Sequence, residues 1–404
     1  MFRKNCLVCN SEELKKIIDL GSHPFADTFI PKSRSHEADK IYPLVCDLCM
    51  ECGHVQTRCE TNPLDRYQQQ DYSYTSSNSK FSRDHWEEFA NEVPVKSNIP
   101  ENSFIVEIGS NDGLLSENLT KKGHKAVGVD PSPYMANLAK QKNIQTYTEL
   151  FGTEVAKRIE EEHGKADLII ANNVYNHSEN PLEFTKAVSS LLKENGKFVF
   201  EQPYWLTSLE SRRFDQIYHE HVSYYTTKSV KKLLENAGME IVHAEIVDYH
   251  GDSLRIIAQN KKNSELPQEA RELIQNEEKL GAFKVETYKE AMKEFDEKKI
   301  NFMVDILRIK QQGMPIIGVG AAAKTNTTLN YYNIDHGILD YVTDASPHKK
   351  GKFTPATRIP IVGDEVFADY DEVYALILSW NISDILKEIL LKINPKIKFL
   401  FLPN

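Results

Sequence analysis

The chain has 404 residues, of which 40% are hydrophobic and 10% aromatic, and its net charge is −10, so it can form two or three domains with sizeable cores. It shows no apolar stretch near the ~20 residues of a membrane helix, no signal peptide after Met1, and no basic block suited to a nucleic-acid backbone. We therefore expect a cytoplasmic monomer that binds neither membranes nor nucleic acids, although helix N-termini could still hold small anions.

The first feature along the chain is a cluster of cysteines. All six lie within the first 59 residues: Cys6, Cys9, Cys46, Cys49, Cys52 and Cys59. Two C-x2-C knuckles about 40 residues apart suit tetrahedral thiolate coordination of zinc, and a reducing cytosol disfavours the alternative of disulfides. For the second knuckle we choose Cys49 and Cys52, because Gly53 can form a tight turn after them. We predict a structural zinc ion held by Cys6, Cys9, Cys49 and Cys52.

Residues 1–70 are expected to form this zinc module, in which 11–18 is the main helical stretch. The polar segment 71–79 contains two tyrosines, and it either links two domains or lines a site. From residue 103 onward, apolar strands alternate with helices of about ten residues, which predicts a parallel, doubly wound sheet. The expected helices are 81–93, 114–122, 134–142, 153–162, 182–193 and 229–237, and the expected strands are 103–108, 125–129, 167–171, 197–201, 239–248 and 253–259.

A charged helical stretch, 266–312, is expected to connect the central domain to a smaller Rossmann-like unit, with a break at Gly281. The expected elements of this unit are the strands 315–319, 338–342, 373–379 and 399–402 and the helices 321–330 and 382–392. The predicted fold class is α/β, with a zinc module at 1–70, a central doubly wound domain at 71–248 and a C-terminal domain with its helical connector at 249–404.

The loop after the first strand of the central domain predicts a cofactor site. Its small residues let the backbone approach a ligand at a helix N-terminus. Asp130 ends the second strand, 21 residues after Gly109, where an acid can reach ribose hydroxyls. Asp112 in the loop would repel a pyrophosphate but tolerate a sulfonium and an ammonium, which favours S-adenosylmethionine over NAD. We expect cofactor binding by Glu107, Gly109, Asn111, Asp112, Asp130, Pro131, Asn172 and Asn173.

Two further loops carry candidate binding residues. Asn172, Asn173 and His177 follow the strand at 167–171 and are expected to face the crevice, although a lone histidine is more often structural. In the last domain, the glycine-containing loop 318–324 opens a helix and forms a weak nucleotide-binding pattern. Lys324 and Asn326 at this helix start could contact phosphates or sugar hydroxyls.

The run from 214 to 221 concentrates the groups that move protons. Tyr218, His219, Glu220 and His221 supply a phenol, two imidazoles and a carboxylate in consecutive positions. Histidine changes its charge nearest pH 7, and a neighbouring carboxylate can orient its ring. The alternative is a histidine-rich loop with satisfied hydrogen bonds. The residues alone do not decide between His219 and His221 as a base.

Taken together, these motifs resemble the three-domain sugar C-methyltransferases that act on nucleotide-linked keto-deoxysugars. The resemblance runs almost end to end, and it implies an N-terminal zinc module, a central class I S-adenosylmethionine domain and a C-terminal Rossmann-like domain. Its marks are Cys6-x2-Cys9, Cys49-x2-Cys52-Gly53, Asp71-Tyr-x-Tyr74-x-Ser-Ser77, the loops 107–113 and 320–324, the run ending at His221, His250-Gly251 and Ser379-Trp-Asn381.

The resemblance implies that His221 is the base that generates an enolate beside a 4-keto group. Tyr218 and Glu220 would form its setting, and Tyr218 and His177 would stabilise the oxyanion. The implied catalytic residues are His221, Glu220, Tyr218, His177 and Tyr74. The expected substrate contacts are Tyr74, Ser77, His177, Tyr224, Lys324 and Asn326. Departures from the family pattern at 174–180 and at Asp252 leave the identity of the sugar open.

Two alternatives stay open. One is an NAD-dependent sugar oxidoreductase or epimerase, which the Asn111-Asp112 pair and the lack of a Tyr-x3-Lys pair disfavour. The other is a zinc-bearing RNA methyltransferase, which the acidic net charge opposes.

Overall fold

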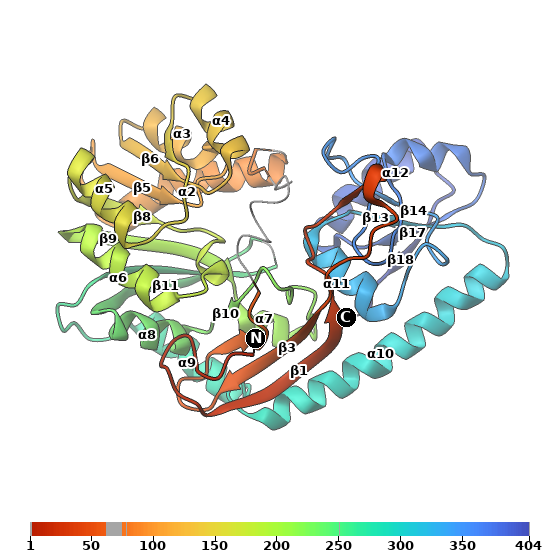
Figure 1. Cartoon of the computed structure of the whole chain (residues 1–404), viewed down its shortest axis with the longest axis horizontal. Helices are drawn as coiled ribbons and strands as arrows, with labels where there is room; N and C mark the ends of the chain where they lie inside the picture. Colours follow the sequence, from red (N-terminus) through yellow and green to blue (C-terminus); the bar gives the residue numbers. More distant parts are fainter. Residues whose placement is uncertain (1, 62–74, 78, 250, 404) are drawn as a thin grey trace.

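The computed structural model describes residues 2–61, 75–77, 79–249 and 251–403. Figure 1 shows the central and C-terminal domains on opposite sides of the molecule, with the zinc module and the long helix α10 (Val285–Gln311) running between them along one side. The main sheets have four, seven and five strands, so the α/β fold class is confirmed. In the described part of the chain, no helix combines the length and apolarity needed to cross a membrane.

The zinc module is built on an antiparallel sheet that it shares with the central domain. Its own strands are β1 (Leu14–His23), β3 (Tyr42–Cys49) and β4 (Val55–Thr57). The fourth strand, β10 (Ser223–Tyr224), belongs to the central domain and pairs with β4. This shared sheet places the zinc module directly beside the segment that follows His221.

The helix predicted at 11–18 is wrong, because this stretch lies mostly in strand β1. Ile17 and Ile18 are buried against the core, and the backbone of β1 is satisfied by its pairing with β3. Branched side chains such as these fit a pleated, half-buried surface well. The partner strand lies about 30 residues away along the chain, so local periodicity could not reveal it.

The central domain is a seven-stranded sheet in the order β11-β12-β9-β8-β5-β6-β7. Strands β5 to β9 run parallel, as predicted, and β12 pairs antiparallel to β9. The strands are β5 (Phe104–Ile108), β6 (Lys125–Val129), β7 (Gln145–Tyr147), β8 (Ala166–Ile170), β9 (Leu192–Pro203), β11 (Met239–Val247) and β12 (Ser253–Asn260). The helices are α2 (Lys80–Lys96), α3 (Leu114–Lys121), α4 (Pro133–Gln141), α5 (Thr153–His163), α6 (Pro181–Leu191), α7 (Trp205–Glu210) and α8 (Thr227–Asn236).

Helices cover both faces of this sheet. On one face, Trp86 and Phe89 of α2 and Leu119 of α3 pack in one apolar cluster with the strands. On the other face, Ile159 of α5 and Phe184 of α6 belong to the main core, which is continuous with that of the zinc module. The carboxyl ends of the parallel strands remain at one edge, where such sheets bind ligands.

The domain boundary predicted between residues 248 and 249 lies within the central sheet. It falls between β11 and β12, which pair antiparallel over their whole length. Because β12 also pairs with β9, both strands belong to the central sheet, and the connector begins after Asn260. An antiparallel hairpin at the edge of a parallel sheet has no separate sequence signal, so the strand pattern alone did not show which domain it joins.

The connector consists of α9 (Gln268–Lys279) and α10, with Gly281 between them at a φ of 74°. The helical connector and its predicted break are therefore confirmed. The C-terminal domain is a parallel sheet in the order β16-β14-β13-β17-β18. Its elements are β13 (Ile316–Val319), α11 (Ala323–Tyr332), β14 (Tyr341–Thr343), β16 (Ile361–Val362), β17 (Tyr374–Ile377), α12 (Ser383–Ile393) and β18 (Lys398–Phe401).

A segment of the zinc module reaches the C-terminal domain. Strand β2 (Ile30–Pro31) pairs with β15 (Lys352–Phe353). Close by, the guanidinium of Arg358 forms an ion pair with Asp39. The zinc module therefore touches both of the larger domains.

Candidate active site and metal centre

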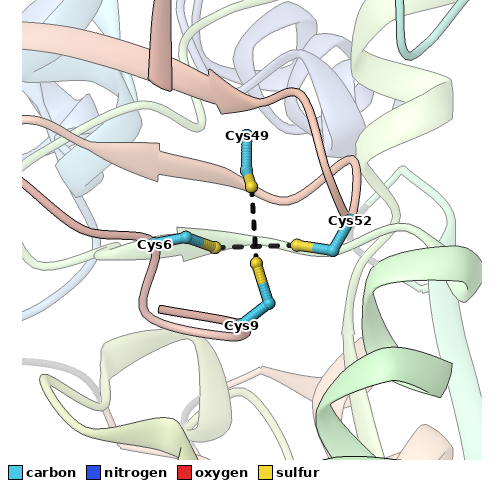
Figure 2. A group of neighbouring side chains, drawn as sticks. All are labelled: Cys6, Cys9, Cys49 and Cys52. Atoms are coloured by element: carbon cyan, nitrogen blue, oxygen red, sulfur yellow. Dashed lines mark hydrogen bonds between the residues drawn. The ribbon is translucent and has the colours of Figure 1, made fainter. Parts of the chain in front are cut away.

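The four predicted metal ligands come together in the zinc module. The Sγ atoms of Cys6, Cys9, Cys49 and Cys52 all lie within 4.8 Å of one another. Figure 2 shows them pointing from two separate loops toward a common centre. Four thiolates at this spacing fit the closed tetrahedral coordination of a structural zinc ion. Gly53 follows the second knuckle with a φ of 73°, as the tight turn requires.

The predicted cofactor loop lies between β5 and α3. Gly109 has a φ of 70°, and a Cβ atom at this position would lie 2.0 Å from Cγ2 of Val174. Asn111 also has a positive φ, of 50°, and Gly113 forms the N-cap of α3. The tight turn therefore leaves the N-terminus of α3 close to the carboxyl ends of β5 and β8. This is the arrangement that brings backbone N–H groups to a ligand.

Asp130 closes the other side of this loop. Its carboxylate accepts the backbone N–H of Asn111 at 2.9 Å and that of Ser132 at 2.9 Å. Each oxygen keeps a second lone pair, which a ribose hydroxyl could use. Pro131 follows Asp130 directly and is half-buried, just before α4. The predicted ribose ligand thus also holds the cofactor loop in place.

Three carboxylates gather at this loop. Glu107 is buried and accepts the hydroxyl of Ser116. Burial, together with the charges of Asp112 and Asp130, raises the pKa of Glu107 to about 8. A cationic ligand would relieve this repulsion, so the acid-rich loop fits the positively charged groups of S-adenosylmethionine.

The charge of Asp112 is partly compensated, which the sequence argument did not foresee. The ammonium of Lys142 lies 3.2 Å from its carboxylate and 3.0 Å from the hydroxyl of Ser77. The backbone N–H of Ser77 also donates to Asp112 at 3.3 Å. Ser77, predicted to contact the substrate, is therefore placed against the cofactor loop. Tyr74, predicted to face the sugar, lies outside the described residues.

Asn172 and Asn173 join the ends of β8 and β9. Oδ1 of Asn172 accepts the backbone N–H of Glu201 at 2.9 Å, and the N–H of Asn173 donates to the carbonyl of Glu201 at 2.7 Å. Within the described residues, the buried Nδ2 of Asn172 has no hydrogen-bond partner. A buried donor of this kind is costly unless a ligand or water accepts from it. Asn172 is accordingly suited to donate to a bound molecule.

Tyr218 and His221 form a hydrogen-bonded pair. The Nδ1 atom of His221 lies 2.9 Å from the carbonyl of Gln216, and since a carbonyl only accepts, Nδ1 carries the proton. In the neutral imidazole, Nε2 then holds the lone pair and accepts the hydroxyl of Tyr218 at 2.6 Å. The ring of His177 lies 4.8 Å from that of His221, centroid to centroid. These three side chains make a compact group capable of proton transfer.

His219 and Glu220 point away from this group, toward the zinc module. His219 donates from Nε2 to the carbonyl of Pro43 at 3.3 Å and packs against Phe25 and Tyr42. The buried carboxylate of Glu220 accepts the backbone N–H of Asp27 at 3.1 Å and that of Ala26 at 3.4 Å. The prediction that Glu220 assists His221 is corrected accordingly, because its carboxylate anchors the zinc module.

Two predicted substrate contacts, Asn326 and Tyr224, are buried. The amide of Asn326 donates to the carbonyl of Ala26 at 2.5 Å. Tyr224 lies in β10, 5% exposed, with its ring centroid 5.0 Å from that of Trp205. The polarity of Asn326 was visible in the sequence, but the long-range partner of its amide was not.

Lys324 lies in a cluster that sequence reasoning largely missed. Its ammonium donates to Oδ1 of Asn381 at 2.6 Å and lies 4.5 Å from the ring centroid of Trp380. The guanidinium of Arg213 lies 4.1 Å from the same ring, and Trp380 donates to Asp215 at 2.6 Å. Burial lowers the pKa of Lys324 to about 8. Arg213, Asp215 and Trp380 also line a cavity of about 180 Å³. The sequence signals of this cluster were Lys324 and the Ser379-Trp-Asn381 motif.

Three family models match the chain in consecutive segments. Residues 6–67 match a zinc binding domain, residues 82–244 a methyltransferase domain, and residues 248–400 a C-methyltransferase C-terminal domain. The C-methyltransferase NovU of Streptomyces niveus is 27% identical, over 93% of this chain and 89% of its own length. A ubiquinone biosynthesis O-methyltransferase of Colwellia psychrerythraea is 24% identical, over 36% of this chain and 64% of its own.

A solved S-adenosylmethionine-dependent methyltransferase from Clostridium acetobutylicum is 18% identical, with a TM-score of 0.36, over 46% of this chain and 93% of its own. The order of the three matched domains, the four-cysteine cluster and the match to NovU over most of both chains agree with one another. The chain is therefore similar to S-adenosylmethionine-dependent C-methyltransferases, and it has the domain order of a zinc-binding module, a methyltransferase domain and a C-methyltransferase C-terminal domain.

Proposed function

We propose that the protein transfers a methyl group to the carbon next to the ketone of a nucleotide-linked keto-deoxysugar, a step of deoxysugar biosynthesis. S-adenosylmethionine supplies an electrophilic methyl group when it is bound. A carbon accepts this group only after it has become a nucleophile, and a neighbouring ketone makes its C–H acidic enough for a base to remove the proton. The site must therefore hold a base, a group that stabilises an enolate oxygen, and a binding place for the nucleotide.

The pairing of Tyr218 with His221 is the observation that carries the proposal. The neutral His221 ring presents its basic Nε2 to the hydroxyl of Tyr218, so it can take a substrate proton directly or through the phenol. His177 lies beside it and can stabilise the oxygen of the enolate. We assign His221 the role of base, and Tyr218 and His177 that of oxyanion stabilisers.

Packing connects this group to the cofactor loop. Val174, which touches Gly109, lies just before the short helix η2 (Tyr175–His177), and the N–H of His177 donates to the carbonyl of Val174. His177 is the third residue after Val174, so its ring lies close along the chain to the contact with the cofactor loop. A carbon held between His177 and His221 would thus lie near the cofactor, as in-line methyl transfer requires.

The cluster around Trp380 supports a nucleotide diphosphate as part of the substrate. Arg213 and Lys324 bring two cations to one ring, whereas Asp215 supplies one carboxylate. Lys324 also lies in the first turn of α11, whose N-cap residue makes no side-chain hydrogen bond to the helix. A helix N-terminus beside two cations suits a diphosphate.

The proposal is tested by exchange of deuterium from the carbon next to the ketone into water, using a nucleotide-linked 4-keto-deoxysugar. The wild type should exchange the deuterium, and His221→Asn should not, while calorimetry shows unchanged binding of S-adenosylmethionine. His219→Asn tests the competing histidine, whose ring contacts the Pro43 carbonyl instead of Tyr218. Normal exchange in His221→Asn together with its loss in His219→Asn would reverse the assignment. Intact exchange with lost methylation would give His221 a role after proton removal.

A further inference from the structure

We propose that the zinc module is a positioning element for the base, and that Gln56 is the residue that connects the two. This inference rests on the proposed role of His221. Residues 217–224, named here the His221 segment, are held largely by groups outside the central sheet. The zinc module would then contribute to catalysis by fixing this segment, in addition to stabilising its own fold.

The last two residues of the His221 segment form a strand, β10, in the sheet of the zinc module. Ser223 and Tyr224 pair with Gln56 and Val55 of β4. The N–H of Thr57 donates to the carbonyl of Val222 at 2.9 Å. The ring of His54 adds a contact at 3.1 Å to the hydroxyl of Ser223. Strand β4 begins three residues after Cys52, so zinc ligation fixes the start of the strand that orders the residues after His221.

Gln56 joins this strand to the other zinc knuckle. Its backbone pairs with Ser223, while its fully buried side chain reaches back to the loop that carries Cys6. Oε1 accepts the N–H of Leu7 at 2.8 Å, and Nε2 donates to the carbonyl of Asn5 at 3.0 Å. The two bonds bracket Cys6 on both sides. Groups behind metal ligands commonly orient them in this way.

The middle of the segment is held by the same module. Glu220 accepts two backbone N–H groups from residues 26 and 27, and His219 donates to Pro43. The C-terminal domain adds one bond at the segment's start, from the hydroxyl of Thr327 to the carbonyl of Ile217 at 2.9 Å. The central domain adds one bond just after His221, from the N–H of Val222 to the carbonyl of Asn176 at 2.9 Å. The other hydrogen bonds described for the residues that flank the Tyr218–His221 pair come mainly from the zinc module.

Hydrogen exchange of the wild-type full chain tests the coupling without substrate. Removing zinc with a chelator should speed exchange of the amides at 222–224 at least tenfold, together with those of the zinc module, and leave β5 and β6 protected. Unchanged protection at 222–224 would overturn the proposal. Loss of protection throughout the central sheet would also overturn it, because zinc would then act on global stability.

Two variants separate positioning from simple stabilisation. Gln56→Leu should slow deuterium exchange of the sugar on the order of tenfold and shift its pH midpoint, with S-adenosylmethionine affinity unchanged and zinc retained. Asn236→Leu is the matched control, because its amide donates to the carbonyl of Val8 in the same knuckle at 2.9 Å but belongs to no strand beside Ser223. The Asn236→Leu variant should exchange deuterium from the sugar at the wild-type rate.

If zinc-loaded Gln56→Leu exchanges deuterium from the sugar carbon at the wild-type rate, the role of Gln56 is refuted. If this variant loses zinc, protection at 222–224 decides, and its retention there would refute the coupling. Failure of the proposed function is separable. If His221→Asn exchanges the deuterium of the sugar normally, His221 is not the base. The zinc-dependent protection of the amides at 222–224 would still be measurable in that case.

Discussion

Glu220→Gln should change how the stability of the protein depends on pH. Glu220 is 6% exposed, and burial raises the pKa of its carboxyl from 4.5 to about 7, although two backbone N–H groups favour its ionised form. Below the pKa of the unfolded state, the carboxyl of Glu220 is neutral in the folded and the unfolded protein, so its burial does not lower the free energy of unfolding. Between the two pKa values the unfolded chain ionises first, so stability falls as pH rises, by about 1.4 kcal/mol per pH unit.

Over the interval from 4.5 to about 7 the loss amounts to about 3 kcal/mol, after which both states are ionised and the difference levels off. The amide variant lacks this step, so the difference in unfolding free energy between wild type and Glu220→Gln should decline by this amount between pH 4.5 and 7. Urea unfolding followed by tryptophan fluorescence measures it, with Glu194→Gln, an exposed glutamate of β9, as the control. A difference that stays constant, or grows with pH, would refute the burial argument.

Further outcomes are expected at the metal, cofactor and nucleotide sites. Elemental analysis should give one zinc per chain in the wild type, and Cys9→Ser should lose it. Cys46→Ser, which changes a residue of β3, should keep the zinc. The opposite pattern would show that the wrong cysteines were chosen. Asp130→Ala should weaken S-adenosylmethionine binding in calorimetry by about 1–3 kcal/mol, because ribose bonds and the support of Asn111 are both lost, and unchanged affinity would place the ribose elsewhere. In the wild type, KM for the nucleotide sugar should rise as pH passes about 8, because Lys324 loses its charge. Lys324→Met should show a raised KM that does not depend on pH in this range. A wild-type pH profile of KM in this variant would exclude Lys324 from the site.

Much of the fold was predictable because its signals are local. The alternation of apolar strands with helices identified both Rossmann-like units, and Gly281 marked the break between α9 and α10. The zinc cluster followed from cysteine spacing, with Gly53 favouring the second knuckle. Strand β1 was misread as a helix, since its pairing partner lies elsewhere in the chain. The strands β11 and β12 were predicted, but their place at the edge of the central sheet depends on the pairing of β12 with β9, which has no local signal.

The candidate site was harder to predict, because its roles depend on where side chains point. Tyr218, His219, Glu220 and His221 are adjacent in sequence, yet the backbone turns two of them toward His177 and two toward the zinc module. Sequence spacing contains no information on that division. The same holds for Asn326, whose amide is used by the zinc module.

The most direct test of the central claim is the position of the transferred methyl group. The enzyme would be incubated with S-adenosylmethionine carrying a ¹³C-labelled methyl group and with a panel of nucleotide-linked 4-keto-deoxysugars, and the products examined by NMR. The account predicts a labelled methyl bonded to the carbon next to the ketone, formed by the wild type and absent with His221→Asn. A labelled methyl on a sugar oxygen, or no transfer to any keto-sugar of the panel, would contradict it.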